Sequence, residues 1–268
     1  MADSHSSGIL EKMSSGNLFS DLTFICRWKF FPVHKVVACA QSDVLMTTVQ
    51  KAEAINQKSG STAIDMSNFE PQTVEMFIKF LYTGDYASTK KNKPFDPSEP
   101  APNILREMVN HIHCHQIASH YQVYNMKKFS NLNLRNLLQT HSYSSGLVSA
   151  LPSAVKIADS LDVELEIQDA LAASFGRHID KLTDDKKLNV IRNMPGFSTL
   201  VLAHCGRNLA LLKDQNAELE KRAQERAKNG VKRPTNMREA IQWTKYRNRV
   251  ARERRHSSRS KSSPQTTK

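Results

Sequence analysis

The chain contains few segments that favour β-structure and many that favour helices, and this imbalance limits the folds it can adopt. Residues 22–26 (LTFIC) and 30–33 are two β-prone runs joined by a short polar connection, which predicts a hairpin. The AIDM segment predicts one further short strand. Later helical patterns cover 104–125, 127–139, 150–161, 163–181, 183–193 and 196–228. The sequence therefore predicts an α+β fold with a small sheet flanked by helices, followed by a helical segment.

Two more helices are expected in the first third of the chain. Residues 34–40 begin a helix that is expected to continue through the QSDVLMTTVQKA segment. A second helix is indicated by apolar residues at helical spacing in TVEMFIKFLY, with Pro71 in its first turn and Gly84 just after its end. The side chains expected in the core of this part are Phe24, Phe77, Phe80, Leu81 and Tyr82.

Several sequence pieces occur in one characteristic order. They are SDLTFIC, then FFPVHKVVACAQSDVL, AIDM, and TVEMFIKFLYTGDY. This order resembles the BTB/POZ domain, specifically the type common in fungal proteins, over roughly residues 18–140. Ala38 departs from the family pattern, which has Leu at that position. The resemblance implies a BTB/POZ-like fold and a non-enzymatic protein–protein interaction adaptor that self-associates.

The resemblance also implies where a second copy would bind. In BTB/POZ domains the N-terminal segment and the first helix form the dimer face and its groove. Four residues of this sequence match those positions: Asp21, His34, Lys35 and Ser42. Three apolar residues are expected beside them: Leu18, Phe19 and Val36. Some members dock a cullin ubiquitin-ligase scaffold through a hydrophobic-x-Glu motif, but here Lys51 stands two residues before Glu53. Because Glu53 still matches the last position of this motif, a substrate adaptor of a cullin-type ubiquitin ligase is an alternative function.

The positive charge of the chain is concentrated near its C-terminus. Between Lys221 and Lys268 there are 16 Lys and Arg residues against 3 Asp and Glu, a net charge of +13. The first 220 residues are nearly neutral, with 22 basic and 23 acidic residues. Such an arm favours a polyanion or a nuclear import receptor as partner, so the nucleus is favoured over the cytoplasm and a nucleic-acid-associated or transcriptional regulator is a further alternative. The expected contacts are Lys245, Arg247, Arg249, Arg252, Arg254 and Arg255.

Four segments are expected from these patterns. They are a flexible N-terminal arm (1–17), the BTB/POZ-like domain (18–140), a helical extension (141–228) and a basic, partly disordered tail (229–268). Within the extension, Leu209, Leu212, Asn216 and Leu219 follow the alternating three- and four-residue spacing of a short coiled coil. Asn216 falls at an a position, where a polar residue selects two parallel strands. The alternative is an amphipathic helix that packs back on the body.

No arrangement of residues indicates catalysis, a cofactor or a metal. The sequence lacks a nucleophile elbow, a phosphate-binding glycine loop and an HExxH motif. His111, His113, His115 and Cys114 have no acidic residue beside them to complete a metal shell, so packing or surface roles are expected. The four cysteines are far apart and are expected to be reduced thiols. No apolar run approaches the ~20 residues of a membrane span, so no membrane partner is expected.

Overall fold

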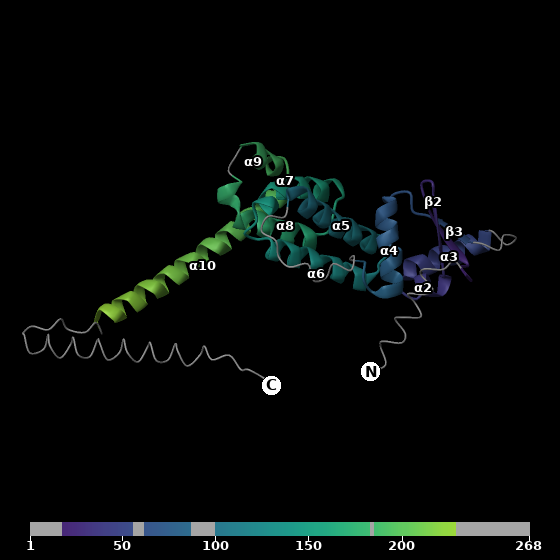
Figure 1. Cartoon of the computed structure of the whole chain (residues 1–268), viewed down its shortest axis with the longest axis horizontal. Coiled ribbons are helices and arrows are strands. Elements are labelled where there is room, and N and C mark those ends of the chain that lie inside the picture. The colour runs from purple at the N-terminus through teal and green to yellow at the C-terminus, as the bar shows by residue number, and fades with distance from the viewer. Residues whose placement is uncertain (1–17, 56–61, 87–99, 183–184, 229–268) are drawn as a thin grey trace, which may run out of the picture. The chain divides into compact units, whose positions relative to one another are not determined.

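The computed structural model describes residues 18–55, 62–86, 100–182 and 185–228 (Figure 1). The chain divides into two compact units, residues 1–209 and 210–268, which are described separately below. The predicted N-terminal arm and basic tail lie outside the described residues.

A three-stranded sheet lies at the N-terminal end of the first unit. Strand β1 (Leu22–Cys26) is central, with β2 (Lys29–Val33) antiparallel on one side and β3 (Thr62–Asp65) parallel on the other. Every second side chain of β1 is buried, because alternate residues of a strand point to the same face. The predicted hairpin and third strand are confirmed, with β3 starting one residue earlier than the AIDM segment.

Helices form the rest of the described chain. Their bounds are α2 Lys35–Cys39, α3 Asp43–Ile55, α4 Pro71–Thr83, α5 Ala101–His120, α6 Tyr124–Thr140, α7 Ser145–Ser160, α8 Leu165–Arg177, α9 Asp185–Arg192 and α10 Pro195–Lys228, with a 3-10 turn at Ile179–Lys181. Helices α5 to α8 contact one another within the first unit (Figure 1). The predicted α+β fold, a small sheet flanked by helices, is confirmed.

The prediction of one continuous helix from residue 34 through QSDVLMTTVQKA is wrong. The structure has two helices, α2 and α3, separated by residues 40–42. The buried Ser42 hydroxyl accepts a hydrogen bond from the Leu45 N–H at 3.0 Å and donates one to the Tyr121 carbonyl. Serine at this position satisfies an N–H group of the first turn of α3, so a new helix begins here.

Helix α4 begins and ends where its sequence predicts. Pro71 occupies the first turn, where the missing N–H costs nothing. Gly84 follows the last turn with a φ of 68°, and its N–H donates to the Phe80 carbonyl at 2.8 Å. Glycine adopts this left-handed conformation without the steric penalty of a side chain, which explains why the helix ends there.

Helix α7 begins five residues before its predicted start at 150. The Ser144 hydroxyl accepts from the Gly146 N–H at 3.1 Å and caps the helix. Pro152 lies inside α7 and is buried. Leu147 and Leu151 are also fully buried, so packing holds the helix together on both sides of the proline.

The first unit has two hydrophobic clusters. One joins the sheet and α2 to α4 with the C-terminal half of α5 and the start of α6, and the predicted core residues Phe24, Phe77, Phe80, Leu81 and Tyr82 are all buried in it. The other joins the N-terminal half of α5 and the rest of α6 with α7, α8, α9 and the first turns of α10. Helices α5 and α6 belong to both clusters and connect them.

Gly176 marks a close approach between α8 and α10. It lies in the last turn of α8. A Cβ atom at this position would lie 3.2 Å from the Cβ of His204, 3.3 Å from the Sγ of Cys205 and 3.3 Å from the backbone oxygen of Val201. The absent side chain therefore allows the two helices to touch.

Gly176→Val is expected to lower the free energy of unfolding by ~1–3 kcal/mol, because the added atoms overpack this contact. Urea denaturation measures the change. The matched control is Gly206→Val, since a Cβ at Gly206 meets nothing within 4 Å. Equal effects of the two substitutions would show that α8 and α10 do not approach as described.

Candidate interaction surface

Three large apolar side chains near the start of the described chain are exposed to solvent. Leu18 is 77% exposed, Phe19 91% and Val36 71%, and we call these residues the N-terminal patch. Phe19 also has a φ of 64°, which is unusual for a bulky residue and costs conformational energy. The sequence-based expectation that these side chains are exposed is confirmed.

His34 lies beneath this patch and fastens the N-terminal segment to α4. The Tyr82 hydroxyl accepts from the His34 backbone N–H at 3.0 Å and donates to its Nδ1 at 2.7 Å. The remaining ring nitrogen, Nε2, donates to the Leu18 carbonyl at 2.9 Å. His34 therefore holds the backbone of Leu18 in place while its own ring is buried.

Asp21 and Lys35 make hydrogen bonds within the chain beside His34. The Asp21 carboxylate accepts from the Lys35 backbone N–H at 2.7 Å, which satisfies an N–H group at the start of α2. The Lys35 ammonium forms an ion pair with Glu53 of α3 at 2.6 Å, and this hydrogen bond raises the pKa of Lys35. Together these bonds position α2, which carries Val36 on its exposed face.

The structure therefore separates the seven predicted dimer-face residues into three groups. Leu18, Phe19 and Val36 present apolar surface, whereas His34 and Ser42 are buried. Asp21 and Lys35 make the bonds that position α2. A contact of any of them with a second copy stays a prediction.

The sequence analysis missed two further exposed aromatic residues. Trp28, in a connection described as polar, and Phe30 of β2 are largely exposed. Phe30 lies on the outward side of the hairpin, because it pairs with Ile25 on the face opposite the buried Phe24. Period-two alternation over residues 28–32 was the available signal.

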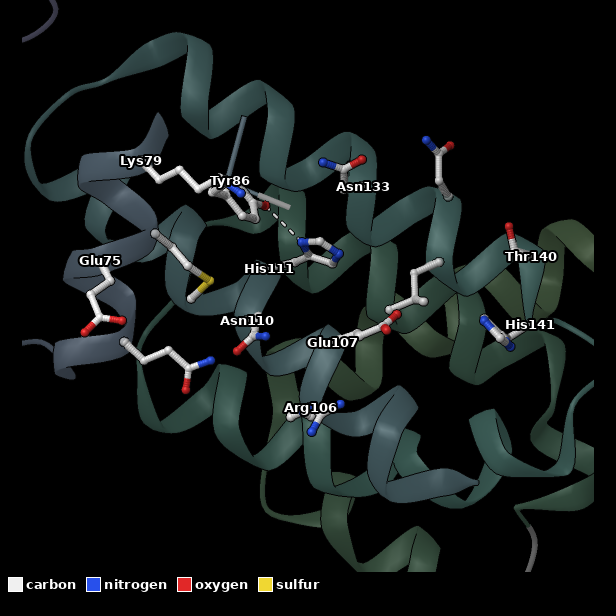
Figure 2. Close-up of a pocket in the computed structure, with 14 residues that line it drawn as sticks. Glu75, Lys79, Tyr86, Arg106, Glu107, Asn110, His111, Asn133, Thr140 and His141 are labelled. Carbon is white, nitrogen blue, oxygen red and sulfur yellow. Dashed lines mark hydrogen bonds between the residues drawn. The ribbon is translucent and has the colours of Figure 1, made fainter. Parts of the chain in front are cut away.

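A polar cleft of about 770 Å³ lies between α4, α5 and α6 (Figure 2). Figure 2 shows Tyr86 and His111 near its centre, Glu75 and Lys79 on the α4 side and His141 at the opposite end. The Tyr86 hydroxyl lies 2.9 Å from Nδ1 of His111. Burial lowers the pKa of His111 to about 4, so the imidazole is neutral at pH 7.

The titratable groups around His111 are also kept in their neutral forms. Burial raises the pKa of the Tyr86 hydroxyl and that of the Cys114 thiol. Cys114 is fully buried, with its sulfur 3.8 Å from that of Met76. A nucleophilic thiolate needs a lowered pKa and access to solvent, so this thiol has the character of a core residue.

His115 lies one turn beyond His111 on α5 and is fully buried. Neither ring nitrogen has a hydrogen-bond partner within the described structure. Burial lowers the pKa of His115 and of nearby His113. No group of three or more His, Cys, Asp or Glu residues in the described ranges could hold a metal ion. Within those ranges, no helix has both the length and the apolar character needed to span a membrane.

The order of the elements, the hairpin with its parallel third strand and the His34–Tyr82 bond together define the N-terminal domain. Residues 10–126 match the family model of the BTB/POZ domain. The domain is thus a BTB/POZ domain, a module that generally mediates protein–protein interaction. No curated protein matches the chain. The relation to fungal BTB/POZ proteins stays a prediction.

Glu53, which the BTB/POZ resemblance places in the cullin-docking motif, is engaged within the domain. Its carboxylate forms the ion pair with Lys35 and lies 3.4 Å from the Thr62 hydroxyl. Lys51, at the position where the motif has a hydrophobic residue, is exposed. Any cullin contact at Glu53 would have to compete with this ion pair.

The residues predicted for a coil lie in α10, beyond the BTB/POZ domain. Leu209, Leu212, Asn216 and Leu219 are all exposed. Cys205, upstream on the same pattern, instead donates from its sulfur to the Gly176 carbonyl at 3.6 Å. The predicted polyanion contacts, Lys245, Arg247, Arg249, Arg252, Arg254 and Arg255, lie outside the described residues.

Proposed function

We propose that the protein is a non-enzymatic adaptor that forms a homodimer through its BTB/POZ domain. The observation that carries this proposal is the N-terminal patch, in which Phe19 combines a positive φ with almost complete exposure. Its conformation costs energy, and almost none of its side chain is buried against the described residues. Covering its ring by a second copy offsets this cost.

The energetics favour a symmetric contact. Fully burying a side chain such as Leu, Val or Phe contributes ~1.5–3 kcal/mol. In a twofold dimer the same patch occurs on both copies, so each of its three residues contributes twice. The rigid support from His34 and the Asp21–Lys35 bond also limits the entropy lost on association.

Val36→Glu is expected to convert the dimer into a monomer, because it places a carboxylate in the apolar contact on both copies. Sedimentation of the full chain at micromolar concentration gives the mass. Val36 is exposed in one chain, so the substitution should leave its fold intact, which circular dichroism checks.

The matched control is Leu165→Glu, an equally drastic change at an exposed residue in the first turn of α8. This variant should remain dimeric. A wild-type chain that sediments as a monomer would contradict the proposal, as would a Val36→Glu chain that stays dimeric.

A role as a substrate adaptor of a cullin-type ubiquitin ligase is the first alternative. Glu53 supports it through its place in α3, but the ion pair with Lys35 and the exposed Lys51 weaken the match. Co-purification of the full chain with a cullin N-terminal domain, lost on Glu53→Ala, would favour this function.

A nuclear, nucleic-acid-associated regulator is the second alternative. The net charge of +13 between Lys221 and Lys268 supports it. Binding of the full chain to DNA or RNA that weakens steeply with salt, and that disappears when residues 229–268 are deleted, would favour it. Loss of nuclear accumulation in the same truncated chain would assign an import role to the tail.

A further inference from the structure

Helix α10 changes its surroundings along its length. In its first turns, Phe197 and Val201 are buried, and the Phe197 ring meets that of Phe175 edge to face at a centroid distance of 6.2 Å. From Leu209 to Glu225, by contrast, every described side chain is exposed. The second compact unit begins within this stretch, at Ala210.

Among the described residues, little packs against the exposed part of α10 to hold it helical. Isolated helices of this length are marginal in water, because most helical stability in proteins comes from packing of an apolar face. Arg222 and Glu218 form an i,i+4 ion pair, which contributes only ~0.3–0.5 kcal/mol. Yet the stretch exposes Leu209, Leu211, Leu212 and Leu219. This combination indicates that a partner covers the leucines.

The spacing of the exposed residues fits a two-stranded coil. Leu209, Leu212, Asn216, Leu219 and Ala223 occupy successive a and d positions of two heptads. Cys205, the preceding d residue, already packs on α8, so the free seam starts at Leu209.

Asn216 identifies the partner as a second copy in parallel register. In that arrangement a positions face each other, and the two Asn216 amides hydrogen-bond across the seam. In an antiparallel pair, or against an unrelated apolar helix, Asn216 would face a hydrophobic residue. Its amide would then be buried without a partner, at a cost of ~1–3 kcal/mol.

The flanking positions are compatible with this arrangement. In a parallel pair each g residue lies near the e residue of the next heptad on the partner helix. These pairs are Asn208 with Lys213 and Gln215 with Glu220, so no like charges meet. We infer that residues Leu209–Ala223 of α10 form a parallel, in-register, two-stranded coiled coil with a second copy of this chain.

This inference rests on the proposed BTB/POZ dimer. Two heptads span only ~22 Å and would pair weakly on their own. A dimer formed elsewhere in the chain raises the effective concentration of the two α10 helices to the order of millimolar. In a parallel coil, the basic segments of the two copies both follow the same end of the coil. One polyanion then meets twice the basic charge.

Cysteine cross-linking of the full chain tests the register. Leu212→Cys places a thiol at a d position, where parallel helices bring residue 212 of each copy together. Asp214→Cys, two residues along on the outer face, is the matched control. Under mild oxidation, the non-reduced gel should show roughly tenfold more cross-linked dimer for Leu212→Cys than for Asp214→Cys. The wild-type chain gives the background from the native cysteines.

Two outcomes overturn the coil. One is a chain that sediments as a dimer while Leu212→Cys forms no more cross-linked product than Asp214→Cys. That result is still consistent with the BTB/POZ dimer. The other is a cross-link that forms when Leu212→Cys chains are mixed with Asn216→Cys chains but not among Leu212→Cys chains alone, because antiparallel helices place a positions opposite d positions. Adding Val36→Glu to Leu212→Cys should reduce the cross-linked product. A monomeric wild-type chain contradicts the proposed function itself, so the two failures are distinguishable.

Discussion

Replacing Phe77 with alanine is expected to lower the free energy of unfolding by ~3–5 kcal/mol. Phe77 is fully buried in the first hydrophobic cluster, with the Phe24 ring 6.5 Å away and the Tyr121 ring 5.5 Å away, between centroids. It thus connects the sheet, α4 and the end of α5. Removing the ring loses its burial and leaves a cavity that these rigid elements cannot close. Urea denaturation followed by circular dichroism measures the loss.

The matched control is Tyr143→Ala. Tyr143 is also aromatic but is 91% exposed in the turn between α6 and α7. Its removal should change the free energy of unfolding by less than ~0.5 kcal/mol. Comparable losses in the two variants would show that the assignment of Phe77 to the core is wrong.

Acidification from pH ~6.5 to about 4 is expected to cost the folded state ~3 kcal/mol through His111. Burial lowers the pKa of His111 from 6.5 to about 4, so over this interval the unfolded chain binds more protons than the folded one. The stability contributed by the neutral imidazole is complete above pH ~6.5 and is lost as pH falls toward 4. The pKa shifts of His113 and His115 have the same direction and add to the loss.

His111→Asn isolates this contribution. Asparagine can present an acceptor toward the Tyr86 hydroxyl where Nδ1 now lies, but it does not titrate. The free energy of unfolding of this variant, measured by urea titration at several pH values, should fall less steeply between pH 6.5 and 4. An unchanged slope in His111→Asn would contradict the neutral state of His111 in the folded chain.

The sequence alone was sufficient to predict a helix end wherever a single residue determines the conformation of that turn. Gly84 ends α4 because only glycine adopts its positive φ cheaply, and Pro71 begins that helix for an equally local reason. The exposed patch was also predictable, since the resemblance assigned Leu18, Phe19 and Val36 to a contact surface.

Long-range contacts decided the features that the sequence analysis missed. Ser42 breaks the expected helix, and its hydroxyl reaches the Tyr121 carbonyl, 79 residues away. The ring of His34 is held by Tyr82 and the Leu18 carbonyl through contacts 48 and 16 residues apart, while its place at a dimer groove stays a prediction. Nothing in the spacing of His34 or Ser42 distinguishes a surface role from these internal bonds.

The sequence by itself determined the types of the elements, the predicted core and the basic character of the C-terminal region, because periodicity, turn residues and charge are local properties. Only the tertiary structure decided that Gly176 marks a helix contact, that His111 faces a cleft and that His115 is enclosed. Each of these depends on which distant helix packs against the residue. Packing also changes the pKa of a histidine, since it removes the water that would stabilise the charged ring.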